Sequence, residues 1–131
     1  MTKSELLAHL NTLLAGRASL IEAEIASTLA ARNSDTKSSA GDKHEVGRAM
    51  IQQELDQQEA QLAKLQALQQ ELARVPVDRA FDRVAFGALV STDQGSYFVA
   101  IGLGQVTVGE ESCFVVSLAS PIGQALKDKQ V

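Results

Sequence analysis

Apolar residues recur at three- and four-residue steps through the first part of the chain, from about Ser4 to Arg32. This spacing is typical of a helix with one apolar face. The apolar stripe consists of Leu7, Leu14, Ala18, Ile21 and Ile25, broadened by Leu6, Leu10 and Leu13. Gly16 is the only helix breaker inside the segment and costs about 1 kcal/mol relative to alanine, which does not stop so periodic a pattern. The pattern predicts one long amphipathic helix.

A second periodic segment follows a polar interval. Residues 33–41 have no stripe and are rich in residues that favour turns. Beyond them, large residues alternate at steps of four and three, which is the spacing of a coiled-coil seam. The seam residues are Ile51, Leu55, Gln58, Leu62, Leu65, Gln69 and Leu72. We expect the two polar members, Gln58 and Gln69, to define the register. Pro76 lacks a backbone donor and disfavours helix at Val75, so the second helix is predicted to end there.

The pattern changes after Pro76 to short runs rich in β-branched and aromatic residues, separated by turn-like segments. The predicted strand regions are residues 83–91, 96–102, 105–108 and 112–118. Asp93-Gln94-Gly95 predicts a hairpin with glycine at a positive-φ position. Ser120 and Pro121 predict the N-cap and first position of a short final helix.

We therefore predict an α+β protein with two parts. Residues 1–75 are expected to form a long antiparallel coiled-coil hairpin, with its tip at about residues 33–45. Residues 76–131 are expected to form a small β-sheet domain with one short helix. A unit of roughly fifty residues is marginal alone, so we expect it to lean on the base of the hairpin or on a second copy.

Composition and charge narrow the class of protein. The chain of 131 residues is 45% hydrophobic and 21% charged, which is typical of a soluble globular protein. Its net charge of −4 argues against broad electrostatic capture of nucleic acid. Cys113 is the single cysteine, so we expect no internal disulfide and no cysteine-rich zinc site. Polar residues interrupt the apolar positions between Leu6 and Leu14, and we expect a cytoplasmic protein without signal peptide or membrane span.

Two acids, Asp42 and Glu45, stand one helical turn apart at the tip of the predicted hairpin. Ser39, three residues before Asp42, fits a capping box, and the helix dipole favours an acid at position 45. Alternatively, the tip carries both carboxylates into the site of another protein. In such sites magnesium is usually bound by one or two carboxylates together with waters and substrate phosphates, so the two tip acids would complete a site that the other protein supplies in part. Both interpretations stay open, because a capped helix start would also hold the two acids at a fixed separation.

Three short motifs, at residues 41–45, 86–90 and 120–126, together resemble the Gre family of bacterial transcription elongation factors. Gly41-Asp42-Lys43-His44-Glu45 resembles the Gly-Asp-x-x-Glu signature that opens the second helix of the Gre coiled coil. Phe86-Gly87-Ala88-Leu89-Val90 resembles the Phe-Gly-x-x-Val strand of the family's FKBP-like C-terminal domain. The segment from Ser120 to Leu126 resembles Ser-Pro-Ile/Leu-x-x-Ala-Leu. The matches occur in family order across nearly the whole chain.

The resemblance implies a bacterial cytoplasmic factor that passes its coiled coil through the secondary channel of RNA polymerase. Such a factor is not itself an enzyme, but stimulates the polymerase to cleave backtracked RNA near its 3′ end. Asp42 and Glu45 match the acids that help to hold a magnesium ion shared with the polymerase, and no cofactor of its own is implied. Ser120, Pro121 and Ile122 are the positions carried over to docking on the polymerase. A plain helix cap is the alternative for Ser120 and Pro121.

Four cations near the tip are candidates for contact with RNA phosphate or the acidic channel walls, with surface solvation as the alternative for each. They are Arg32, Lys37, Lys43 and Arg48.

The chain also departs from the Gre pattern. Val46 and Ala49 stand where the family has Asn and Tyr, and Gre proteins continue into further strands where this sequence ends at Val131. A shortened sheet is expected to leave an exposed edge that pairs with a partner or, as a homodimer, with another copy. These departures motivate two alternatives: a secondary-channel inhibitor without cleavage activity, and a structural self-associating coiled-coil adaptor. A prolyl isomerase pocket is hard to build from Tyr97 and four phenylalanines without tryptophan.

Overall fold

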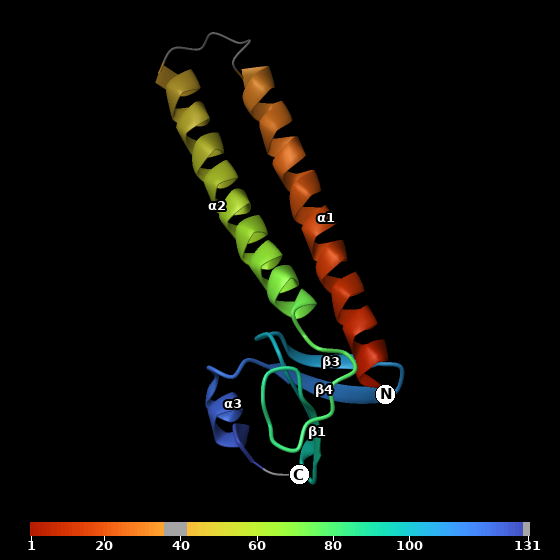
Figure 1. Ribbon diagram of the computed structural model, residues 1–131. Helices are drawn as coiled ribbons and strands as arrows, with labels where there is room; N and C mark the ends of the chain where they lie inside the picture. The colour runs from red at the N-terminus through yellow and green to blue at the C-terminus, as the bar shows by residue number, and fades with distance from the viewer. Residues whose placement is uncertain (36–41, 130–131) are drawn as a thin grey trace. The chain divides into compact units, whose positions relative to one another are not determined.

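The computed structural model describes residues 1–35 and 42–129 (Figure 1). Two long helices, α1 (Lys3–Asp35) and α2 (Asp42–Ala73), precede four strands and a short helix, α3 (Pro121–Leu126). The strands are β1 (Leu89–Thr92), β2 (Gly95–Val99), β3 (Gly104–Val108) and β4 (Glu111–Val116). The predicted α+β class and the predicted order of elements are confirmed.

The chain divides into two compact units. Unit 1 consists of Met1–Thr12 and Leu68–Val131, and unit 2 consists of Leu13–Ala67. The start of α1 and the end of α2 therefore belong to the same unit as the sheet. This is consistent with the expectation that the small sheet region leans on the base of the two helices.

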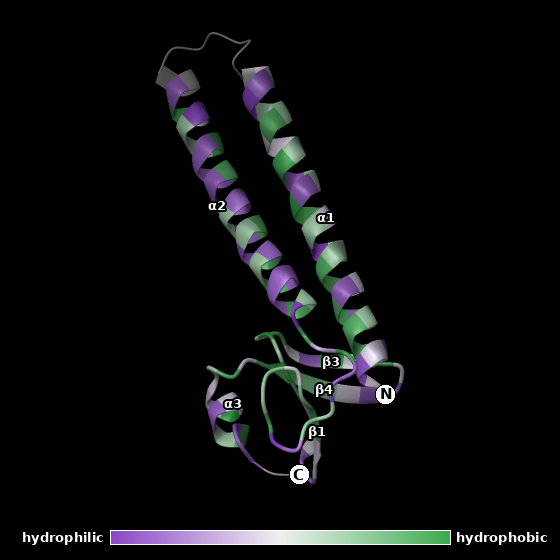
Figure 2. Ribbon diagram, viewed as in Figure 1, coloured by the Kyte–Doolittle hydropathy of each residue, from purple (hydrophilic) through white to green (hydrophobic). Residues whose placement is uncertain are grey.

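The helices of unit 2 lie side by side and run in opposite directions (Figure 1). Their buried residues follow the predicted stripes: Leu14, Ala18, Leu55, Gln58 and Leu65 are buried, while Ile21, Ile25, Ile51 and Leu62 are half-buried. Figure 2 shows hydrophobic and hydrophilic bands alternating along both helices, as a one-sided apolar stripe requires. Thr28 extends the buried stripe of α1, and its hydroxyl donates to the carbonyl of Glu24 at 3.0 Å.

The ends of the helices differ slightly from the prediction. Residues 33–35 were predicted as turn and are helical. Asn, Ser and Asp cost only a few tenths of a kcal/mol each in a helix, and neither glycine nor proline occurs among these three residues. At the other end, α2 stops at Ala73, and Val75 N–H donates to the Leu72 carbonyl at 3.2 Å. The predicted stop before Pro76 is confirmed.

The four strands form one mixed sheet in the order β1-β2-β4-β3. β2 and β4 are parallel, and the two outer pairs are antiparallel. Leu89 pairs with Phe98, which in turn pairs with Val115, so one row of apolar side chains crosses three strands. Phe98 and Val115 are fully buried, which identifies this face as part of the core of unit 1.

The prediction of one strand over residues 83–91 was wrong for residues 84–88, which lie in no strand, and Arg83 forms an isolated β-bridge. Gly87 has φ +93°, and Ala88 N–H donates to the Ala85 carbonyl at 3.0 Å, so a turn precedes β1. A Cβ on Gly87 would lie 2.9 Å from Cδ of Pro76, closer than side chains tolerate. Glycine is therefore required here by both backbone conformation and packing.

The other predicted strands are found within three residues of their predicted ends. The hairpin predicted at Asp93-Gln94-Gly95 is confirmed: Thr92 pairs with Gly95, whose φ is +119°. The hydroxyl of Thr92 donates to the Gly95 carbonyl at 2.8 Å and accepts from Gln94 N–H at 3.0 Å.

The buried side-chain amide of Gln58 allows the predicted coiled-coil seam to be tested by mutation. Its Nε2 donates to Glu54 at 3.5 Å, whereas its Oε1 is buried without a hydrogen-bond partner among the described residues. We expect Gln58→Leu to raise the free energy of unfolding by about 1 kcal/mol, because an unpaired buried acceptor is removed. Thermal unfolding measures the change, and Gln57→Leu at the exposed neighbour is the matched control. A lower melting temperature for Gln58→Leu would contradict this account of the seam.

Candidate functional site

The two acids of the predicted tip lie at the start of α2. The helix begins at Asp42, and Glu45 follows three residues later with an exposed side chain. Residues three apart on a helix are neighbours on its surface. The side chain of Asp42 and the whole of Ser39, the predicted capping residue, lie outside the described residues. The backbone of α2 thus brings the two acid positions together at the helix end that favours negative charge.

Two exposed apolar side chains follow Glu45 along α2. Val46 and Met50 are one turn apart on α2, with exposed fractions of 61% and 65%. Exposed large apolar residues of this kind are available for contact with a partner. The sequence analysis noted Val46 only as a departure from the Gre pattern and did not single out Met50. Their four-residue spacing, at positions outside the predicted seam, is the feature of the sequence that predicts a shared exposed face.

The four candidate cations are only partly described. Arg32 lies in the last turn of α1 and is half-buried, and Arg48 is exposed on α2, one turn after Glu45. Lys37 lies outside the described residues. Lys43 belongs to α2, but its side chain also lies outside the described part. Arg48 follows Glu45 by three residues, so the two positions are neighbours on the surface of α2.

Ser120 caps α3. It has extended backbone angles, its hydroxyl accepts from Gly123 N–H at 3.0 Å, and it donates to the Ser117 carbonyl at 2.7 Å. Pro121 occupies the start of the helix, as the sequence predicted. These two residues are therefore engaged in forming α3. Ile122 differs, because 38% of it is exposed and available to a partner.

Gly123 is a structural requirement that the sequence analysis missed. It is buried, and a Cβ built on it would overlap the carbonyl oxygen of Ser117 and lie 2.9 Å from Cα of Leu118. Both neighbours are backbone atoms, which cannot swing aside. In the motif match this glycine stood at an unspecified position. Its role comes from the close approach of α3 to residues 117–118.

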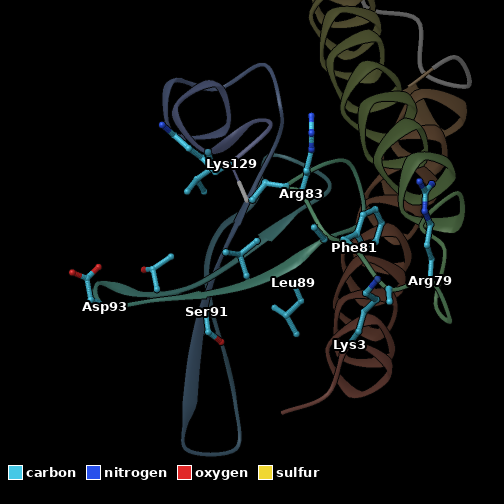
Figure 3. A pocket seen from close by; sticks show the side chains of 14 residues that line it. Lys3, Arg79, Phe81, Arg83, Leu89, Ser91, Asp93 and Lys129 are labelled. Atoms are coloured by element: carbon cyan, nitrogen blue, oxygen red, sulfur yellow. The ribbon is translucent and has the colours of Figure 1, made fainter. Parts of the chain in front are cut away.

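Unit 1 also contains a pocket of about 590 Å³ that the sequence did not predict (Figure 3). It is lined by residues 79–81, 83 and 84, by β1 and its flanking residues, and by Lys3, Leu126 and Lys129. Its charged lining residues are Lys3, Arg79, Arg83 and Lys129 against the single acid Asp93. These residues come from four separate places in the sequence, and no local motif connects them.

A cation–aromatic cluster forms one wall of this pocket. Lys3 Nζ lies 4.8 Å from the ring centroid of Phe81, and the guanidinium carbon of Arg79 lies 4.9 Å from the same centroid. Lys3 Nζ also donates to the Pro76 carbonyl at 3.0 Å. Partial burial, followed by repulsion from Arg79, lowers the pKa of Lys3. The wall therefore holds two cations close together around one ring.

Cys113 is buried on β4. Burial raises the pKa of its thiol. The thiolate is the reactive form of cysteine, so this environment disfavours nucleophilic chemistry at Cys113.

No protein-family model matches the chain, and comparisons with curated proteins and with solved structures likewise found no match. Across residues 1–35 and 42–129, no helix combines the length and the apolar character needed to cross a membrane.

The packing around Gly123 is directly testable. We expect Gly123→Ala to lower the free energy of unfolding by about 2 kcal/mol or more, because the added methyl group overlaps fixed backbone and forces α3 away. Chemical denaturation measures the loss. Gly102→Ala is the matched control, since its Cβ would have no neighbour closer than 4.0 Å. Equal stability of the two variants would contradict the close approach of α3.

Proposed function

We propose that the chain is a Gre-like factor of the bacterial cytoplasm that enters the secondary channel of RNA polymerase and stimulates cleavage of backtracked RNA. The observation that carries the proposal is the place of the two acids. Asp42 and Glu45 lie at the start of a helix of 32 residues, which spans about 48 Å at 1.5 Å per residue. A helix of that length can carry its first turn deep into a partner protein.

In this proposal α1 and α2 form an antiparallel coiled-coil hairpin. The buried stripes of unit 2 support it, because both helices bury seam residues spaced at alternating three and four. Residues 76–131 form, in this proposal, an FKBP-like domain that docks at the channel rim. The order of elements, with two long helices before the sheet and α3, is consistent with a helical segment that enters the channel and a C-terminal region that docks at its rim.

The tip residues fit a site that is completed by the polymerase. Carboxylates are the oxygen ligands that magnesium prefers, and it commonly takes only one or two of them from a protein. Glu45 is exposed, and Asp42 shares the start of the helix with it. When bound, magnesium activates a water and neutralises charge on the phosphate. The chain's own contribution is to present two carboxylates at a spacing set by the helix, while Val46 and Met50, exposed farther along α2, offer apolar contact to the partner.

Removal of the two tip charges tests the proposal. We expect Asp42→Asn/Glu45→Gln, or the double alanine variant, to reduce cleavage in a backtracked complex by about 100-fold or more, because the carboxylate oxygens no longer hold the shared metal. Binding to the polymerase should change little. The assay follows the length of the 3′-labelled RNA fragments over time.

The matched control is Asp56→Asn/Glu59→Gln, which neutralises two exposed acids at the same three-residue spacing farther along α2. We expect this control to cleave as the unaltered protein does. Full cleavage by the tip variant would refute the proposed role of Asp42 and Glu45.

An inhibitor that docks in the same way without cleavage is the second candidate function. The exposed apolar side chain of Val46, directly after Glu45, is the observation that favours it. The two functions differ in a single assay on a backtracked polymerase. Shortened RNA supports the cleavage factor, and slowed synthesis without shortened RNA supports the inhibitor.

Docking through α3 gives a separate prediction. We expect Ile122→Glu to weaken binding to RNA polymerase about tenfold without lowering the melting temperature, because Ile122 is exposed and its loss removes an apolar contact. Gln124→Glu, exposed on the same helix, is the control. Ser120→Ala should instead lower stability by about 1 kcal/mol through loss of the cap. Unchanged binding by Ile122→Glu would show that α3 is not the docking surface.

A further inference from the structure

The outer edge of β1 presents backbone groups in the pattern of a free strand. β1 ends the order β1-β2-β4-β3, and within the described residues no strand pairs with its other side. Val99 N–H donates to the Ala88 carbonyl at 3.0 Å. Because bonded and non-bonded pairs alternate along an antiparallel ladder, Val90 and Thr92 direct their backbone groups to β2, and Leu89 and Ser91 direct theirs away from it. Two N–H groups and two carbonyls therefore face outward along this edge.

The cationic pocket surrounds this same edge. Every residue from Ala88 to Asp93 lines it. In Figure 3, Leu89 and Ser91 lie on one side of the β1 ribbon, whereas Arg83 and Lys129 lie on the other. The pocket is thus a groove along the strand, and its sides combine apolar surface with charged groups.

The charge of the groove is opposite to that of the whole chain. Its lining holds four cations and one acid, whereas the chain carries a net charge of −4. Lys3 and Arg79 share the ring of Phe81, and the lowered pKa of Lys3 reflects partial burial and this crowding. An anionic occupant would relieve the repulsion between them.

We propose that this groove binds an extended, acidic peptide segment of a partner protein, which adds to β1 as a fifth strand. The peptide backbone supplies both donors and acceptors, and so matches the outward groups of Leu89 and Ser91. A small anion satisfies only the N–H groups and meets the two outward carbonyls unfavourably. A second copy presenting its own β1 would bring four cations against four cations, which disfavours self-pairing at this edge. The proposal uses residues of unit 1 alone and goes beyond the cleavage function, which depends on the tip of α2.

Hydrogen exchange on the full chain tests the added strand. The probe is a capped peptide of about eight alternating glutamate and valine residues, long enough to span β1. In the free protein we expect the amides of Leu89 and Ser91 to exchange fast and those of Val90 and Thr92 to exchange slowly. The probe should protect Leu89 and Ser91 about tenfold or more. The same peptide with lysine in place of glutamate should give no protection.

Two further experiments distinguish binding as an added strand from binding by charge attraction alone. N-methylation of alternate peptide amides blocks one set of backbone hydrogen bonds, so one methylation register should abolish binding and the other should preserve it. Arg79→Glu/Arg83→Glu should weaken binding about tenfold at low ionic strength, and by less at roughly 0.5 M salt. The charge-matched control is Arg17→Glu/Arg74→Glu, at two exposed arginines that do not line the groove.

Several results would overturn the proposal. They are equal binding of the lysine peptide, equal binding in both methylation registers, and unchanged exchange at Leu89 and Ser91 when the probe is bound. Protection of those two amides in the protein alone, rising with concentration together with a dimer in sedimentation, would assign the edge to a second copy instead. Because the methylated peptides leave the protein unaltered, the result does not depend on the folding of any variant. If the peptide does not bind while RNA cleavage is intact, this inference alone is refuted. If the peptide binds but the protein does not stimulate RNA cleavage, the proposed cleavage function alone is refuted.

Discussion

The joint burial of helix ends and sheet residues in unit 1 is the interaction on which the rest of the structure depends. Leu6 and Leu10 of α1 and Leu72 of α2 are almost completely buried in the same unit as Phe98 and Val115. Burial of one such side chain contributes about 1.5–3 kcal/mol. A sheet region of roughly fifty residues is marginal without such contributions. The sheet region therefore depends on being buried together with the two ends of the helical segment.

The close backbone packing of unit 1 also changes the meaning of the sequence motifs. Gly87 is required by its positive φ and by its approach to Pro76, and Ser120 forms the cap of α3. Two of the three motifs that resemble the Gre family thus contain residues that the fold itself needs. These two motifs therefore indicate how the chain folds more than they indicate what it does. The functional part of the resemblance depends instead on Asp42 and Glu45 at the start of α2, where the side chain of Glu45 is exposed.

Charge is distributed unevenly over unit 1, although the chain as a whole is acidic. The cations of the pocket gather around β1, the one antiparallel edge strand that borders it. An exposed strand edge is prone to non-specific pairing, and positive charge is a common protection against self-association. The same charges leave the edge open to an acidic strand, so protection and selective binding are compatible at β1.

The sequence by itself determined the features that depend on neighbouring residues. These are the two long helices with their buried stripes, the end of α2 before Pro76, the hairpin at Gly95 and the cap formed by Ser120. Periodicity, proline geometry and capping act within a few residues, so they can be read without knowledge of the fold.

Only the tertiary structure decided the features that join distant segments. The parallel pairing of β2 with β4, the irregular path of residues 84–88 and the need for glycine at position 123 follow from contacts between residues far apart or from backbone crowding. The groove at β1 likewise joins Lys3 to Arg79 and Lys129, which no local spacing relates. Such features depend on which surfaces pack together, and that choice is made by burial over the whole unit rather than by local pattern.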